Sequence, residues 1–177
     1  WSLQLPINSS GELSGTNDCY DIPTSDLTSA AYTNPASGSY CGGQVTNYFY
    51  TGADGAMTFW APDYGARTPS SSHARSELSQ LSRTWFLRGT HTLNVQCKVL
   101  QLSSDTVCIG QIKGFSPNMT CVMLFFGTNG VLSARVHTRA DESATENPVF
   151  GTVGLSNAFS YTLQAVDGLV TVAANGI

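Results

Sequence analysis

The chain has 177 residues, and its 8 Lys and Arg against 12 Asp and Glu give a formal net charge of −4 and a pI near 5.1. This length suits one domain with a sizeable core, and no apolar run reaches the roughly 20 residues that a membrane-spanning helix needs. The acidic balance argues against nucleic-acid binding, although a few clustered cations can still dominate one anion-binding cleft.

Strand signals dominate the chain, and the only helix signal is a turn or two near 24–31. In chain order, the predicted strands cover 48–51, 57–60, 91–102, 107–113, 120–126, 131–138, 160–166 and 169–173. Glycine-containing turns such as Asp54-Gly55 and Asp167-Gly168 join several of them. We therefore predict an all-β fold in one domain over 1–177: a jelly roll or concanavalin-like sandwich of two antiparallel sheets.

The five cysteines show neither a CxxC pair nor zinc-ligand spacing, so we expect no metal and no cofactor. Cys19 and Cys41 flank a stretch rich in Thr, Ser, Asn and Pro, and we predict a disulfide between them. Cys97, Cys108 and Cys121 lie on three successive predicted strands. Both Cys108–Cys121 and Cys97–Cys108 fit a hairpin register; we take Cys108–Cys121 as the second predicted disulfide and keep the other pairing as its alternative.

Secretion is the predicted localisation. Asn8 and Asn118 begin Asn-x-Ser/Thr sequons and are candidate glycosylation sites, and only 11% of the residues are charged. A signal peptide is absent, and we interpret the start at Trp1 as a processed terminus. We expect an extracellular monomer without a membrane or nucleic-acid partner.

Three segments stand out by their order and spacing. They are Thr58-Phe59-Trp60-Ala61-Pro62, then Arg75-Ser76-Glu77-Leu78, then Ile109-Gly110-Gln111-Ile112-Lys113. With these segments the chain resembles polysaccharide lyase family 7, the alginate lyases. The opening Trp1-Ser2-Leu3-Gln4-Leu5-Pro6 and the late Tyr161-Thr162-Leu163 also match family landmarks, so the resemblance covers almost the whole chain.

The resemblance implies cleavage of an acidic polysaccharide by β-elimination. The C5 proton of a uronate is poorly acidic while the adjacent carboxylate keeps its charge, so hydrogen-bond donors must stabilise the dianion-like intermediate. A guanidinium and a side-chain amide suit that role, and Arg75 and Gln111 match the family's residues in it. Glu77 shares a strand face with Arg75, and we expect a bidentate pair that orients the guanidinium. The alternative for this pair is an ordinary surface ion pair.

The sequence departs from the family's pattern at three places. The family's His is Lys113, which either acts as a base of lowered pKa or holds the substrate carboxylate as a cation. The family's second Arg is Ser79. The C-terminal Tyr-Phe-Lys-x-Gly-x-Tyr strand, which carries the catalytic tyrosine, has no match. We expect that this chain lacks its C-terminal strands and that a complementary C-terminal fragment of the same protein is a possible partner.

Four further basic residues are candidates for substrate binding. His73 precedes the Arg75 motif and is either a loop histidine or a replacement base. Arg135, His137 and Arg139 alternate on one predicted strand face. They either extend the cleft as subsites for an acidic chain or form a solvated face, and the sequence favours neither reading.

The resulting prediction is a secreted, endo-acting lyase of alginate that leaves 4,5-unsaturated uronate ends. In mannuronate, the C5 hydrogen and O4 lie on one side of the ring, so one tyrosine can act as base and acid; the loss of the family's His therefore favours mannuronate-rich substrate. One alternative is a lyase of another uronan such as glucuronan. Another is a carbohydrate-binding jelly roll without catalysis. A hydrolase is disfavoured because Glu77 has no evident acidic partner.

Overall fold

The computed structural model describes residues 2–15, 19–21, 47–69, 71–80, 88–114, 120–139 and 143–176. The regular elements of these residues are β-strands, β1 to β13, and every strand pair is antiparallel, which confirms the predicted all-β class. They form two compact units, Trp1–Arg83 and Thr84–Ile177, and each is taken by itself below. The single domain over 1–177 stays a prediction. No helix within the described ranges is long and apolar enough to cross a membrane.

The first unit contains two small sheets. The strands are β1 (Ser2–Gln4), β2 (Tyr20–Asp21), β3 (Phe49–Thr51), β4 (Met57–Phe59) and β5 (Glu77–Ser79). β1 lies between β2 and β5, while β3 and β4 form the hairpin predicted around the Asp54-Gly55 turn. The core of this unit consists of the buried side chains Leu3, Leu5, Ile7, Cys19, Tyr48 and Phe49. The predicted helical turn at 24–31 lies outside the described residues.

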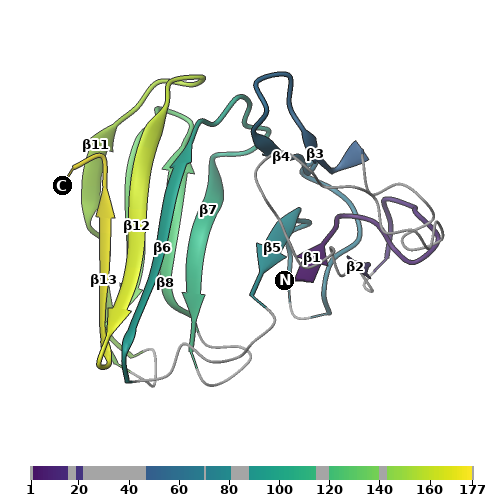
Figure 1. Cartoon of the computed structure of the whole chain (residues 1–177). Coiled ribbons are helices and arrows are strands. Elements are labelled where there is room, and N and C mark those ends of the chain that lie inside the picture. Colours follow the sequence, from purple (N-terminus) through teal and green to yellow (C-terminus); the bar gives the residue numbers. More distant parts are fainter. Residues whose placement is uncertain are drawn as a thin grey trace. The chain divides into compact units, whose positions relative to one another are not determined.

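The second unit contains two larger sheets. Its strands are β6 (Thr90–Cys97), β7 (Thr106–Lys113), β8 (Thr120–Gly127), β9 (Val131–His137), β10 (Thr145–Glu146), β11 (Val149–Thr152), β12 (Phe159–Val166) and β13 (Leu169–Ala174). One sheet has the order β10-β9-β8-β7, with β11 also paired to β9, and the other has the order β13-β12-β6. Figure 1 shows β13, β12 and β6 as a layer in front of β8.

The core of the second unit lies between these two sheets. Alternate residues of β8 point inward, so that Val122, Leu124 and Phe126 are fully buried. They meet the inner face of β12, and the rings of Phe126 and Phe159 stack with centroids 5.8 Å apart. Because burial of apolar surface is the main favourable term in folding, this alternation fixes which face of each strand is left for function.

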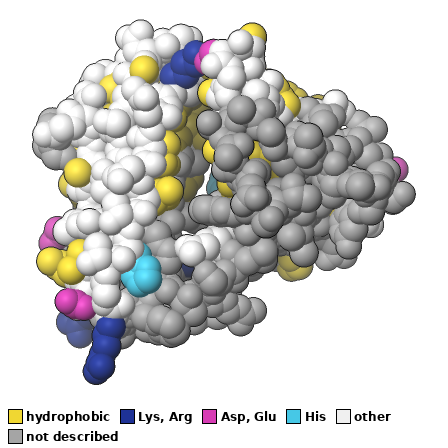
Figure 2. Space-filling model, in the orientation of Figure 1, with side chains coloured by type: hydrophobic (Ala, Val, Ile, Leu, Met, Phe, Trp, Pro, Cys, Tyr) yellow, Lys and Arg dark blue, Asp and Glu magenta, His cyan; other side chains and the backbone are white. Residues whose placement is uncertain are grey.

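The outer face of the β13-β12-β6 sheet is polar but uncharged. Thr162 Oγ1 donates to Asn94 Oδ1 at 2.8 Å, and Gln164 Nε2 donates to Thr92 Oγ1 at 2.9 Å. These three strands contain no Asp, Glu, Lys or Arg. Uncharged groups, drawn in white, make up most of the described surface seen in Figure 2.

The cysteines of the second unit contradict the second predicted disulfide. Cys97, Cys108 and Cys121 are thiols and form no disulfide, so the predicted Cys108–Cys121 bridge is wrong, and so is its alternative. The register explains this: Cys108 pairs with Phe125, toward the opposite end of the β7–β8 ladder from Cys121. Cys19 is disulfide-bonded, but Cys41 lies outside the described residues, so the Cys19–Cys41 pairing stays a prediction.

Candidate functional site

The Arg75 motif leads into β5 of the first unit. Its inward-facing residues anchor it: Leu78 packs against the core, and Ser76 Oγ donates to the backbone carbonyl of Tyr48 at 2.8 Å. Since side chains alternate along an extended segment, Arg75 and Glu77 extend to the opposite face. The predicted pairing on one face is therefore present.

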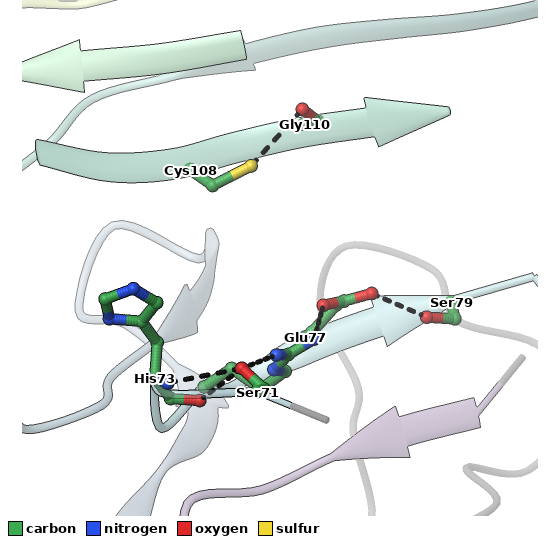
Figure 3. A network of polar contacts seen from close by, with 7 residues as sticks. Ser71, His73, Glu77, Ser79, Cys108 and Gly110 are labelled. Atoms are coloured by element: carbon green, nitrogen blue, oxygen red, sulfur yellow. Dashed lines mark hydrogen bonds and ion pairs between the residues drawn. The ribbon is translucent and has the colours of Figure 1, made fainter. Parts of the chain in front are cut away.

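A chain of polar contacts holds the Arg75 guanidinium (Figure 3). Arg75 Nη1 lies 3.4 Å from Glu77 Oε2, and Nη2 donates to Ser71 Oγ at 2.5 Å. Ser79 Oγ donates to Glu77 Oε1 at 3.0 Å. The ion pair is thus a single contact rather than the predicted fork, because the second guanidinium nitrogen is turned to Ser71. A guanidinium has five N–H donors, so this arrangement fixes its direction and still leaves donors for an anion.

His73 lies beside this network but does not enter it through its ring. Its backbone N–H donates to Ser71 Oγ, and Ser71 Oγ donates to its carbonyl, both at 3.2 Å. Figure 3 shows the imidazole pointing away from these contacts. The side chain is exposed, which fits the loop-histidine alternative; a role as base stays untested.

In the second unit, Gln111 and Lys113 extend from the outer face of β7. Ile112 between them is buried in the core, which turns both neighbours outward. In the ladder, Gln111 pairs with Met123 of β8, and Met123 pairs with Arg135 of β9. Residues paired in this way point to the same face, so Gln111 and Arg135 are two strands apart in one row.

β9 adds two basic side chains to this outer face. Arg135 lies over the Phe125 ring, with its Cζ 5.7 Å from the centroid, a cation–π contact that holds the guanidinium over the sheet. His137 follows two residues later on the same face, and its Nδ1 is buried without a hydrogen-bond partner among the described residues. Arg139 is exposed and lies beyond the end of β9, so it does not share the regular strand face that we predicted for it.

The charge on this face has one sign. β7, β8 and β9 contain no Asp or Glu, whereas Lys113, Arg135 and the titratable His137 extend from them. We call the outward-facing Gln111, Lys113, Arg135 and His137 the basic face. Such a face favours an anionic ligand and disfavours a cation.

Sequence reasoning found most of these residues but missed two partners. Ser71 orients Arg75, and its only sequence signal is its place in the serine-rich loop before the motif. Phe125 supports Arg135, which becomes visible only once the strand register is known. The predicted meeting of Arg75 with Gln111 concerns residues of the two separate units and stays a prediction.

The two predicted glycosylation sites, Asn8 and Asn118, belong to other parts of the sequence. Asn8 Oδ1 accepts from the backbone N–H groups of Ser10 and Glu12, and its Nδ2 donates to Glu12 Oε2 at 3.1 Å, so the side chain closes a turn. Its glycosylation stays a prediction, and Asn118 lies outside the described residues.

Among the residues that the structure describes, no group of three or more His, Cys, Asp or Glu is placed to hold a metal ion.

Comparisons with known proteins bear on the family and the fold. The family model for alginate lyase matches residues 1–177. Alginate lyase A1-II', a member of polysaccharide lyase family 7, is 29% identical, with 99% of this chain and 73% of that chain covered and a TM-score of 0.75. A variant of A1-II' solved in complex with a substrate, GGMG, is also 29% identical, with 99% and 71% covered and a TM-score of 0.72. The alginate lyase from Corynebacterium sp. is 20% identical and shows the fold alone, with a TM-score of 0.67 and coverage of 100% and 72%. A comparison with curated proteins found no match.

Proposed function

Because the chain belongs to the alginate lyases of polysaccharide lyase family 7, we propose that it cuts alginate within the polymer by β-elimination. As a polysaccharide lyase acting on alginate, it takes a polymer with one carboxylate on every sugar. The proposal adds the endo mode, a preference for mannuronate-rich stretches and products with a 4,5-unsaturated uronate at the new end. It further takes the protein to be secreted, because an extracellular polymer needs an enzyme outside the cell.

The observation that carries the proposal is the basic face. Cations and an amide extend from β7 and β9, and neither these strands nor β8 between them contains an acidic residue, in a chain whose formal net charge is −4. The outer face of the β13-β12-β6 sheet is uncharged by contrast. An acidic polysaccharide is therefore drawn to one side of this unit rather than to its surface in general.

In the proposed mechanism, donors stabilise the carboxylate of the sugar that loses its C5 proton. Arg75 supplies a guanidinium whose direction is set by Ser71 and Glu77. Gln111 supplies an amide from the outer face of β7. These groups strengthen their hydrogen bonds as charge builds on the carboxylate, which lowers the barrier to elimination. A base takes the C5 proton and an acid protonates the departing O4; the resemblance assigns both roles on mannuronate to a tyrosine of the C-terminal strand that has no match in this sequence.

Lys113 is proposed to hold the carboxylate as a cation. It is exposed at the end of β7, two residues after Gln111. A lysine ammonium is a compact point charge with three donors on a flexible stem, which suits it to attract a carboxylate. Activity that disappears in Lys113→Ala and in Lys113→Gln, but survives in Lys113→Arg, would support this role over that of a base.

Arg135 and His137 are proposed to bind sugars beyond the one that reacts. Arg135→Ala removes a cation and its support on Phe125, and we expect a higher KM on polymer with little change in kcat, because uniform binding is lost. The Michaelis constant should also depend less on salt in this variant, since fewer charges are screened. An unchanged KM would instead indicate that Arg135 lies on a solvated face without a role in binding.

The test of the function is the ultraviolet absorbance of the new C4=C5 double bond. The intact protein is incubated with polymannuronate, polyguluronate and glucuronan, and viscosity is followed in parallel because endo cleavage lowers it early. Absorbance that rises fastest on polymannuronate is the expected result, whereas a faster rise on glucuronan would identify glucuronan as the preferred substrate instead of alginate. Binding without absorbance on any polymer would reject lyase activity and favour a carbohydrate-binding role.

Two substitutions test the site assignment against a matched control. Arg75→Ala and Gln111→Ala should each abolish most of the absorbance change. Gln164→Ala removes the same kind of amide from the uncharged outer face of β12, where Gln164 bonds Thr92, and should leave the rate unchanged. Full activity in Arg75→Ala or Gln111→Ala would contradict the assignment.

A further inference from the structure

β7 carries a bulge immediately before Gln111. Cys108 pairs with Phe125 and Gly110 pairs with Leu124, so two steps on β7 match one step on β8, and Ile109 is the extra residue. A bulge of this kind interrupts the ladder, bends its strand and changes the direction of the side chains that follow it. The direction of Gln111 therefore depends on how firmly this bulge is held.

Tyr161 holds the bulge from the opposite sheet. It comes from the inner face of β12, is only 5% exposed, and its hydroxyl donates to the backbone carbonyl of Ile109 at 2.5 Å. This bond gives the Ile109 carbonyl, beside the register shift, a hydrogen-bond partner. A buried carbonyl without a partner lowers the stability of the folded state.

Gly110 is shaped to the same ring. A Cβ added at Gly110 would lie 3.0 Å from both Cε2 and Oη of Tyr161, closer than ordinary carbon contacts allow. Glycine at this position lets the tyrosine ring press directly on the backbone of β7. Gly110 and Gln111 thus act together: the glycine leaves room for the Tyr161 ring, and the ring supports the backbone that directs the Gln111 side chain.

We propose that Tyr161 is a positioning residue for Gln111, acting through the Ile109–Gly110 bulge. This inference rests on the proposed function, in which Gln111 binds the substrate carboxylate. Tyr161 does not touch substrate itself, because its hydroxyl is committed to Ile109 inside the core. Burial also raises the pKa of Tyr161, which keeps the hydroxyl protonated and donating.

The substitution Tyr161→Phe removes the hydroxyl and keeps the ring. We expect kcat on alginate to fall about tenfold with little change in KM, because a misdirected amide loses contact mainly as charge develops. Phe159→Leu is the control: it alters a buried aromatic residue two positions earlier on the same face and should lower thermal stability without lowering kcat well below the melting temperature.

A double-mutant cycle distinguishes positioning from a general structural role. If Tyr161 acts through Gln111, then Tyr161→Phe should cause no further loss of kcat in a Gln111→Ala background. Losses that multiply in the double variant, or a Tyr161→Phe enzyme with the kcat of the parent, would overturn the inference. Full activity in Gln111→Ala alone would instead refute the proposed function, so the two failures can be told apart.

Gly110→Ala provides a second approach from the other side of the contact. The added methyl group pushes against the Tyr161 ring, and we expect a loss of kcat and of stability. Adding Tyr161→Leu makes room and should restore part of the stability but not kcat, because the hydroxyl bond to Ile109 is lost. Recovery of the parent kcat in this double variant would contradict a link between the Tyr161 hydroxyl and the direction of Gln111.

Discussion

Replacing Glu77 by Gln tests whether the direction of the Arg75 guanidinium matters for catalysis. The two side chains are nearly equal in size, so Glu77→Gln removes a charge without opening a cavity. The amide oxygen can still accept from Ser79, which donates to Glu77 at 3.0 Å in the parent. The ion pair with Arg75 is lost, and Ser71 remains as the other anchor of the guanidinium.

The geometry sets the size of the effect on stability. At the observed 3.4 Å, two unit charges attract by about 5 kcal/mol for an effective dielectric constant of about 20. The side chains are 23% and 22% exposed, so desolvation, screening and lost side-chain entropy reduce the net value to about 1 kcal/mol. We therefore expect the melting temperature to fall by only about 2–4 °C.

The expected effect on catalysis is larger than the effect on stability. With one of two anchors removed, the guanidinium samples other directions, and we expect kcat to fall about five- to tenfold, which corresponds to about 1–1.4 kcal/mol of transition-state stabilisation. The absorbance assay on polymannuronate well below the melting temperature measures this change. The double variant Ser71→Ala with Glu77→Gln removes both anchors and should approach the activity of Arg75→Ala.

Ser79→Ala is the matched control for this series. It removes a donor to Glu77 but leaves the contact between Arg75 and Glu77, so its rate should stay within about twofold of the parent, as expected for the loss of a single neutral donor. If Glu77→Gln and the double variant both retain the parent kcat, the pair is an ordinary surface ion pair and the orientation argument fails.

Two further predictions concern the second unit. Gly130→Ala should lower the free energy of unfolding by more than about 2 kcal/mol in denaturant titrations. Gly130 has a φ of 73°, and an added Cβ would lie 2.0 Å from the Val153 carbonyl oxygen. Gly127→Ala is the control: this position has room for a Cβ, and the loss should be less than half as large. Burial raises the pKa of Cys97 from 9.0 to about 11, so the folded state holds this proton longer than the unfolded state does. The resulting contribution to stability is complete below pH 9.0 and is lost as the pH rises toward 11, and melting temperatures measured across this range should fall less steeply in Cys97→Ala. An equally steep fall in Cys97→Ala would contradict that assignment.

The strand pattern of the second unit was predictable because its period of two is tied directly to burial. Leu93, Val95 and Cys97 alternate along the predicted strand 91–102, and each of them packs against the core between the sheets. The hairpin at Asp167-Gly168 is confirmed as well, with Val166 paired to Leu169. In both cases neighbouring residues in the sequence decide the structure locally.

The bulges were not predictable from the same pattern, and the error in the cysteines has a separate cause. A bulge depends on which residues meet across the ladder, and this is a property of the register rather than of either strand alone. The β7–β8 ladder shifts twice, once after Cys108 and once after Ile112, and it leaves Cys108 opposite Phe125. The two shifts offset each other, because the Cys108–Phe125 and Lys113–Thr120 pairs belong to the same register. The predicted bridge failed because this register places Cys121 beside Ile112 and Lys113 rather than opposite Cys108.

The same distinction applies to the candidate site: local spacing was predictable, whereas contacts that depend on a loop or on the strand register were not. The spacing of Arg75 and Glu77 predicted their pairing, because residues two apart on an extended segment share a face. The anchor of Arg75 on Ser71 was missed, because it requires the preceding loop to return toward the strand. The row from Gln111 through Met123 to Arg135 was also missed, since it exists only in the final register.

The basic face also shows why its polar residues depend on the core behind them. Ile112 is buried directly behind the row that holds Gln111, and the Tyr161 ring presses on Gly110 one residue earlier. A substitution in the core can therefore change the direction of an outward side chain without touching it. Loss of activity in such a variant, measured at a temperature where the protein is fully folded, would identify residues that act through the backbone of β7 rather than through substrate contact.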